Sequence, residues 1–360
     1  MKLFNLYKIQ KATTTSREFF INNSGIKCVH YGDIYKNYSF KFINSSNIIN
    51  SFSKDVKTSL ILKEDSIIIP DVTETVSDYG HPTYIKYDGT PYINGTHALA
   101  ITSNGGNLKY LFYYLQNPSN IKRLQSLLLG STVFGISIKD FEKFELKEYE
   151  SDRTYQQHIV DIIGSIDDKI ENNNKIIEKI WNYLELFHTC YKNENNKYNY
   201  NITQIAEIKY GKSIPTSNIQ KNGKYPVYGS NGIIGFLDNY EYEKHKIAIS
   251  CRGNSSGIIH LTQKNSTITS NSLVLNFFDK KYTYYFYLEF CNRGLYEFKT
   301  GSAQPQITID NLSKLSIDIV KNIDKYNNYV SIFVDYIFNL KNEINSLLEL
   351  KKLYLKKFFS

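Results

Sequence analysis

A heptad pattern between Tyr155 and Tyr191 constrains the fold of this chain more than any other feature. Large side chains, all but one of them apolar, recur there at alternating steps of four and three without an intervening proline. This spacing predicts a long helix that needs a second helix beside it, because one apolar stripe cannot bury itself. The expected seam consists of Ile159, Ile163, Ile166, Ile170, Asn173, Ile177, Ile180, Leu184, Phe187 and Tyr191.

The partner helix is expected near the end of the given sequence, where the same spacing recurs. Its seam would comprise Phe333, Ile337, Leu340, Ile344, Leu347, Lys351, Tyr354 and Phe358. At about 1.5 Å per residue each helix would be roughly 50 Å long, which favours a spacer rod with a globule attached to each helix over two core helices of one globule. A twofold relation between the two halves would make this coiled coil antiparallel. Asn173 is expected to fix the register. Lys351 interrupts the second seam, and with Lys352, Lys356 and Lys357 also in the last turns, that end is expected to splay or to contact phosphate.

The two halves of the sequence repeat each other. Residues 130–138 (GSTVFGISI) align with residues 301–309 (GSAQPQITI), and the short apolar runs at 66–70 and 246–250 occupy equivalent places. A duplication of about 180 residues predicts two mixed α/β (α+β) globules, each followed by a long helix, in a pseudo-twofold arrangement. The expected segments are a globule at 1–150, a helix at 151–197, a second globule at 198–322 and a second helix at 323–360.

The net charge of +8 resides in both globules and not in the first long helix. Two basic globules suit a polyanion that is contacted twice, although heavy use of Lys, Asn, Ile and Tyr would also follow from an AT-rich genome. The four cysteines form no C-x-x-C pair, so neither a metal site nor a disulfide framework is expected. No apolar run of 18 residues and no signal peptide are found, and the expected location is the cytoplasm.

Catalytic signatures largely fail in this sequence. Residues 206–213 nearly spell a phosphate-binding loop, but Ala206 replaces its first glycine and Pro215 interrupts the helix that should follow. The E-x-K triplets at Glu145 and Glu207 lack a convincing acidic partner upstream. Neither an Asn/Asp-Pro-Pro-Tyr/Phe motif nor a G-x-S-x-G elbow occurs. We therefore expect a chain that is not an enzyme and binds no cofactor itself.

Polar loop residues suited to reading bases remain in both globules. In the second globule the candidate DNA contacts are Lys212, Ser213, Tyr228, Ser230, Asn231, Arg252, Asn254, Ser255, Ser302, Gln304 and Gln306. Arg252 could take guanine O6 and N7 together, or form an ordinary surface ion pair. In the first globule the candidates are Lys11, Thr13, Tyr31, Asp33, Asp71, Thr73, Tyr79 and His97, of which His97 could instead be a core histidine.

Three stretches carry a family resemblance. Residues 156–171 (QQHIVDIIGSIDDKIE), 225–235 (YPVYGSNGIIG) and 301–307 (GSAQPQI) resemble the central helix and the motifs that open and close the target recognition domains in specificity subunits of Type I restriction-modification systems. The resemblance covers essentially the whole chain. The first globule lacks the opening motif in this form, as expected of a half that reads a different sequence.

The resemblance implies a DNA-binding protein of phage defence without catalytic activity. Each target recognition domain would read half of a bipartite, asymmetric site in double-stranded DNA. The helices would set the gap and dock two modification (methyltransferase) subunits, which bind S-adenosylmethionine, and through them restriction subunits that use ATP and Mg²⁺. The polar docking face would comprise Gln157, Asp161, Asp167, Asp168 and Lys169. Alternatives are the specificity subunit of a Type IIB-like methyltransferase-nuclease, a DNA enzyme, and a coiled-coil scaffold that binds only proteins.

Overall fold

A computed structural model describes residues 2–21, 25–147, 149–194, 197–301 and 304–359. The chain divides into two compact units, of which the first comprises Met1–Ile170 with Asn345–Ser360 and the second comprises Glu171–Ile344. Within the described residues, no helix combines the length and the apolar character that crossing a membrane requires.

The first unit is built on a five-stranded sheet with the order β1-β10-β6-β8-β4, accompanied by a four-stranded sheet, β2-β5-β3-β9. Its strands are β1 (Tyr7–Gln10), β2 (Phe20–Ile21), β3 (Ile26–Val29), β4 (Phe42–Ile43), β5 (Asn50–Phe52), β6 (Ser66–Pro70), β7 (Val72–Thr73), β8 (Thr83–Ile85), β9 (Tyr92–Asn94), β10 (Ala98–Ser103) and β11 (Phe134–Gly135). Its short helices are α1 (Tyr31–Asp33), α2 (Leu108–Tyr114), α3 (Pro118–Gln125) and α4 (Ile138–Phe141).

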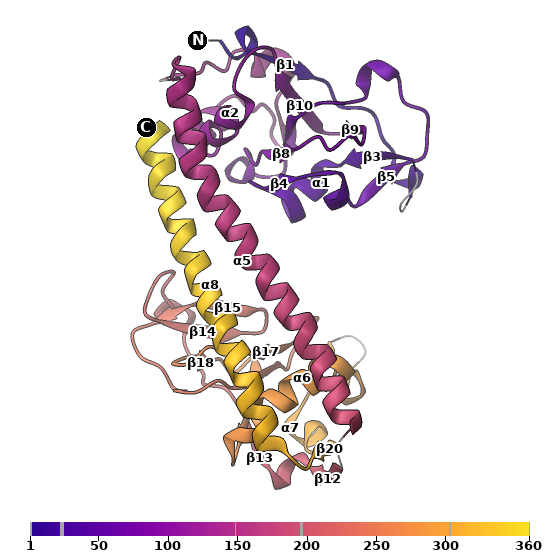
Figure 1. The fold of residues 1–360 in the computed structure, drawn as a ribbon, viewed down its shortest axis with the longest axis vertical. Coiled ribbons are helices and arrows are strands. Elements are labelled where there is room, and N and C mark those ends of the chain that lie inside the picture. Colours follow the sequence, from indigo (N-terminus) through magenta and orange to yellow (C-terminus); the bar gives the residue numbers. More distant parts are fainter. Residues whose placement is uncertain (1, 22–24, 148, 195–196, 302–303, 360) are drawn as a thin grey trace. The chain divides into compact units, whose positions relative to one another are not determined.

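Alternation along β6 explains the layers of the first unit. Ile67 and Ile69 point into a core shared with α2, while Ile68 between them enters a second core on the other face of the sheet. Asn107 caps the N-terminus of α2, where its side chain accepts a hydrogen bond from the Tyr110 amide at 3.1 Å. This helix lies between the sheet and the long helix α5 (Arg153–Glu194) (Figure 1).

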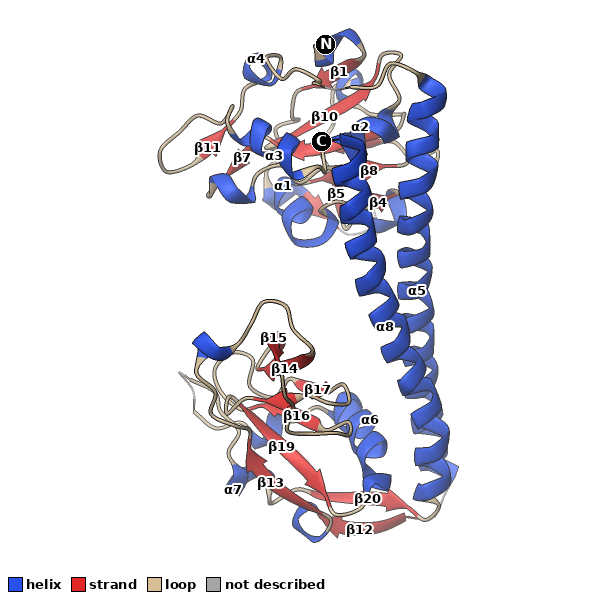
Figure 2. Ribbon diagram, turned by 90° about the vertical axis from the view of Figure 1, so that its left-hand side faces the viewer, coloured by secondary structure: helices blue, strands red, loops and turns tan. Residues whose placement is uncertain are grey.

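The second unit repeats this plan. Its main sheet has the order β13-β19-β16-β17, with β14, β15 and β18 in a separate sheet. The strands are β12 (Lys197–Asn201), β13 (Ala206–Tyr210), β14 (Tyr225–Gly229), β15 (Gly232–Leu237), β16 (Ile247–Ser250), β17 (Ile259–Leu261), β18 (Thr267–Ile268), β19 (Ser272–Phe277) and β20 (Ser316–Val320), and the helices are α6 (Thr283–Arg293), α7 (Ile309–Leu312) and α8 (Ile323–Phe359). The strand β12, which follows α5, pairs antiparallel with β20, which precedes α8 (Figure 2).

Matching hydrogen bonds confirm the duplication. The Tyr114 hydroxyl donates to the carbonyl of Lys147 at 2.8 Å, and the Tyr285 hydroxyl donates to the carbonyl of Asp318 at the same distance. Each tyrosine lies on the helix that covers the main sheet of its unit, and each carbonyl follows the closing motif of its repeat. The tandem pair of mixed α/β domains predicted from the sequence is therefore confirmed.

The helices α5 and α8 pair antiparallel in both units. In the first unit, Ile159 and Ile163 of α5 share a core with Leu355 and Phe359 at the end of α8. In the second unit the end of α5 packs against the start of α8, mainly through aromatic rings, with Phe187 and Tyr326 centroids 5.5 Å apart. Among the other seam positions, Ile166, Asn173, Leu184, Ile337 and Leu340 are buried, and Ile170, Ile344 and Leu347 are half-buried.

Both polar seam residues are buried, and each has an acidic partner. Asn173 is fully buried and donates from Nδ2 to Glu343 Oε2 at 2.8 Å, so its partner is a glutamate and not a second asparagine. Lys351 is also buried and lies 2.8 Å from Asp167 Oδ1. The expectation that Lys351 splays the helices or contacts phosphate is wrong, because its ammonium group is paired inside the first unit.

Candidate nucleic-acid interface

In the second unit, the segments that follow β13 and β16 and the segment that precedes β19 meet at one edge of the main sheet. The Lys212 amide donates to the carbonyl of Ile268 at 2.8 Å. The Cys251 amide donates to the carbonyl of Asn271, and the Cys251 carbonyl accepts from the Ile307 amide, both at 3.0 Å. These bonds join segments that lie far apart in the sequence.

Further backbone and side-chain contacts extend this junction. Arg252 and Gln306 are paired across an isolated β-bridge. The turn between β14 and β15 joins them, because Ser255 Oγ donates to Asn231 Oδ1 at 2.5 Å. We call the resulting group the second-unit loop cluster, and its members are Lys212, Ser213, Ser230, Asn231, Arg252, Asn254, Ser255, Gln304 and Gln306.

Glycines permit this close approach. A Cβ atom on Gly211 would lie 2.4 Å from the carbonyl oxygens of both Ile268 and Thr269, so only glycine fits beside Lys212. Gly253 has a φ of +68°, a left-handed conformation that turns the chain directly after Arg252. These two glycines thus allow the backbone segments that carry Lys212 and Arg252 to pack closely while both side chains remain exposed.

The cluster is exposed and carries positive charge. Within it, only Ser230 and Ser255 are half-buried, and the other side chains are exposed. Arg252 forms no ion pair with any residue that the structure describes, which argues against the interpretation of a surface salt bridge. Exposed Arg, Lys, Asn, Gln and Ser side chains are those that donate to phosphates and to base edges.

Two candidates of the second unit are not part of this surface. Tyr228 is buried, and its hydroxyl accepts from the Gln263 amide at 3.0 Å inside the unit. The structure therefore argues against its prediction as a DNA contact. Ser302 lies outside the described residues.

In the first unit, four of the predicted residues lie around one turn. His97 Nδ1 is 3.1 Å from Asp71 Oδ1, and the ring of Tyr31 packs edge-on against the His97 ring with centroids 5.5 Å apart. Burial raises the pKa of the Asp71 carboxyl, while its contacts with His97 and the charge of Lys11 oppose this shift. The Asp71 carbonyl also accepts from the Ile136 amide at 2.9 Å, as Cys251 accepts from Ile307 in the second unit.

The other first-unit candidates lie in the interior or in internal hydrogen bonds. Thr13, Thr73 and Tyr79 are buried, and complete burial raises the pKa of the Tyr79 hydroxyl well above its usual value. The structure thus argues against these side chains as DNA contacts, since they are almost entirely buried. Asp33 is half-buried and accepts a hydrogen bond from Asn50 Nδ2 at 2.6 Å.

The predicted docking residues separate into two groups. Gln157, Asp161, Asp168 and Lys169 are exposed on α5, and Gln157 Nε2 donates to Asp161 Oδ1 at 2.7 Å. Asp167 instead pairs with Lys351 and is half-buried, with its side chain 18% exposed. Its role as a docking residue stays a prediction.

One feature beside the second-unit loop cluster had no signal in the sequence. A cavity of about 370 Å³ is lined by Asn254, Ser256, Tyr296 and Lys299, among others. The Lys299 ammonium lies 4.4 Å from the ring centroid of Tyr296, which is 77% exposed. No group of histidine, cysteine, aspartate and glutamate side chains that could hold a metal ion is found in the described part of the chain.

Comparisons with known proteins agree with this geometry. The model of the Type I restriction modification DNA specificity domain matches residues 8–182 and again residues 193–350. A candidate type I specificity subunit of Mycoplasma genitalium is 24% identical over 275 residues, covering 70% of this chain and 71% of the relative. The crystal structure of a Type I restriction-modification S subunit from M. genitalium shares the fold, with a TM-score of 0.64 at 18% identity over 100% of this chain and 95% of that chain. Because the domain matches once in each repeat and spans almost the whole chain, the protein belongs to the Type I restriction-modification DNA specificity family.

Proposed function

We propose that this chain is the non-catalytic DNA reader of a Type I restriction-modification complex and that each repeat reads one half of a bipartite, asymmetric site. The observation that carries the proposal is that the two units have equivalent backbone pairings at the same edge of their main sheets. Arg252 opposes Gln306 in the second unit as Val72 opposes Gly135 in the first. Two equivalent surfaces with different side chains would suit two half-sites of different sequence.

Phosphates and bases would be contacted by different residues of the second-unit loop cluster. Lys212 would supply salt-sensitive affinity for the backbone, whereas Arg252 would distinguish guanine by a bidentate hydrogen bond. Each lost base contact would cost roughly 1–3 kcal/mol at its own position. A lost phosphate contact would weaken binding to all sequences alike.

Partner subunits would perform the chemistry. The exposed Gln157, Asp161, Asp168 and Lys169 form a polar stretch of α5 to which modification subunits could dock. Those two subunits would bring S-adenosylmethionine and take up the flipped adenine, and restriction subunits with ATP and Mg²⁺ would join through them. This chain would then need no cofactor site of its own.

The test is the methylome of a host that expresses this chain with its modification subunit. We expect a bipartite methylated-adenine motif, in which Arg252→Ala relaxes one position of one half and leaves the other half unchanged. Lys280→Ala is the matched control. Lys280 is exposed and follows the C-terminal end of β19, whereas the loop cluster lies at the N-terminal end of that strand. No chain-dependent methylation by an assembled complex, or equal loss at both halves, would contradict the proposal.

A further inference from the structure

His97 of the first unit is held in an uncommon backbone conformation. Its φ is +60°, in the left-handed region that residues other than glycine seldom occupy, at the turn between β9 and β10. The turn is fixed from within, because the buried Asn94 Nδ2 donates to the carbonyl of Ala98 at 2.6 Å. Strained residues that the surrounding structure holds in place are concentrated at functional sites.

Asp71 determines how the imidazole can hydrogen-bond. An ionised carboxylate only accepts, so the 3.1 Å contact requires the proton on His97 Nδ1. In the neutral ring, Nε2 then carries the lone pair and is an acceptor. Nε2 has no hydrogen-bond partner among the described residues, and the His97 side chain is 47% exposed.

The position of this pair matches that of the second-unit loop cluster. The Asp71 amide donates to the carbonyl of His97 at 3.1 Å, just as the Cys251 amide donates to the carbonyl of Asn271 at 3.0 Å. His97 precedes β10 as Asn271 precedes β19, and the two strands are equivalent in the repeat. His97 therefore occupies the edge that in the second unit presents Arg252.

We propose that His97 reads a base bearing an exocyclic amino group, adenine or cytosine, and that Asp71 is the positioning residue that keeps Nε2 an acceptor. In the major groove adenine N6 and cytosine N4 are donors, whereas guanine and thymine present acceptors at the corresponding places. The Tyr31 ring, packed edge-on against the imidazole, limits its rotation. This inference rests on the proposed function, since it names the base class that the first unit reads.

Selection of bound sites from randomised duplexes, with the complete complex of this chain and its modification subunit, tests the inference. The wild type is expected to select adenine or cytosine at one position of one half-site, and the result identifies which of the two. In His97→Gly, where the glycine adopts the left-handed turn without strain, the preference for adenine or cytosine at that position should fall about 10-fold. Asp71→Asn permits both tautomers and should admit guanine or thymine at that position alone.

Acid supplies a readout that a purely structural role would not change. Protonation makes Nε2 a donor, so at a pH low enough to protonate the imidazole the wild type should shift toward guanine or thymine at the same position. Among the described residues, Asp71 and Tyr31 contact His97, the charge of His97 acts on His30, and the charge of Lys11 acts on Asp71. The His97→Gly variant, which lacks the imidazole, should show no such shift.

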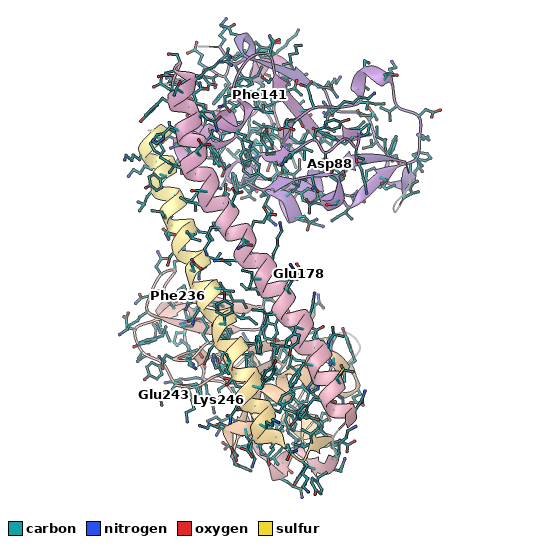
Figure 3. All side chains as sticks on the ribbon, in the orientation of Figure 1. Asp88, Phe141, Glu178, Phe236, Glu243 and Lys246 are labelled. Carbon is teal, nitrogen blue, oxygen red and sulfur yellow. The ribbon has the colours of Figure 1, made fainter. Side chains whose placement is uncertain are left out.

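Asp88→Asn is the matched control for the removal of a carboxylate. Asp88 (Figure 3) is exposed and accepts a hydrogen bond from Ser45. It lies beyond the end of β8, and that end pairs with Ser66, at the other end of β6 from Asp71. Weaker binding of His97→Gly and Asp71→Asn to all sequences, with every base preference intact, would overturn the inference. A wild-type complex that selects no sequence would overturn the proposed function itself, and the inference with it.

Discussion

Charged side chains are buried beside the long helices in both units. In the first unit the Lys351 ammonium contacts both carboxylate oxygens of Asp167, and the Tyr113 hydroxyl donates to the same carboxylate at 3.1 Å. In the second unit His188 Nε2 lies 2.9 Å from Glu289 Oε2, and Lys192 lies 2.6 Å from Oε1. Removing one member of such a group leaves an uncompensated buried charge.

Lys351→Met should destabilise the chain by about 3 kcal/mol or more, because Asp167 would remain buried without its counterion. Burial already raises the pKa of Asp167, and Lys351 opposes this shift. Loss of the lysine would raise the folded-state pKa further above the unfolded value, so stability would fall as pH rises through that interval. Urea denaturation should therefore show a smaller penalty at about pH 4 than at about pH 7.

The exposed Lys352→Met is the control for this change and should have little effect. Asp167→Leu with Lys351→Met should recover much of the stability, since an apolar pair needs no counterion. A Lys351→Met variant as stable as the wild type at pH 7 would show that the pair contributes nothing.

Glu289→Gln should remove part of the acid sensitivity of the chain. Burial raises the pKa of Glu289, but hydrogen bonds from His188 and Lys192 outweigh it and lower the pKa to about 2. With a lowered folded-state pKa, the carboxylate stabilises the fold above the unfolded value of 4.5 and this contribution is lost as pH falls toward 2. The stability difference between wild type and variant should thus grow from about pH 2 to pH 5.

Urea midpoints measured across that range test the Glu289 prediction. Glu178→Gln is the control, since Glu178 is exposed on α5 (Figure 3) and its substitution should leave the pH profile unchanged. A constant difference between wild type and Glu289→Gln at every pH would mean that the carboxylate keeps its unfolded pKa.

At the scale of the elements, α5 contains a glycine that packing does not require. A Cβ atom on Gly164 would lie 3.5 Å from the Tyr113 hydroxyl, an ordinary contact distance. Gly164→Ala should therefore stabilise the chain by about 0.5–1 kcal/mol, because alanine loses less backbone entropy in a helix interior. Thermal unfolding would measure the gain.

Gly294→Ala is the contrasting substitution. Gly294 follows the end of α6 with a φ of +70°, where an alanine is strained, so the variant should be less stable than the wild type. Destabilisation by Gly164→Ala to the same degree would indicate that α5 has no room for the methyl group.

The sequence predicted the elements better than the individual contacts. Heptad spacing predicts paired helices because it depends on local periodicity, and the repeat revealed the domains because both copies kept their closing motifs. Burial of Tyr79 and Tyr228 could not be predicted, since a tyrosine suits a core as well as a surface. The role of Lys351 depends on Asp167, which lies 184 residues earlier in the chain.

The loop segments that meet in the candidate interface were predictable in the same limited sense. Their polar composition indicated the residues near Lys212, Arg252 and Gln306, but their junction is made by backbone bonds between distant strands. No local pattern reports such bonds. The pairing of His97 with Asp71 was likewise hidden, because the two residues are 26 positions apart in the sequence and only the sheet brings them together.

At the scale of the whole molecule, the two repeats should read DNA independently. His97 contacts Asp71 and Tyr31 within the first unit, whereas Arg252 opposes Gln306 within the second, so the two sites share no partner in the described structure. Effects of changes at sites without shared partners usually add. In site selection by the complete complex, His97→Gly and Arg252→Ala should each relax one position in a different half-site. The double variant should then relax both positions by the product of the two single factors, and a much larger or smaller loss would show that the half-sites are read cooperatively.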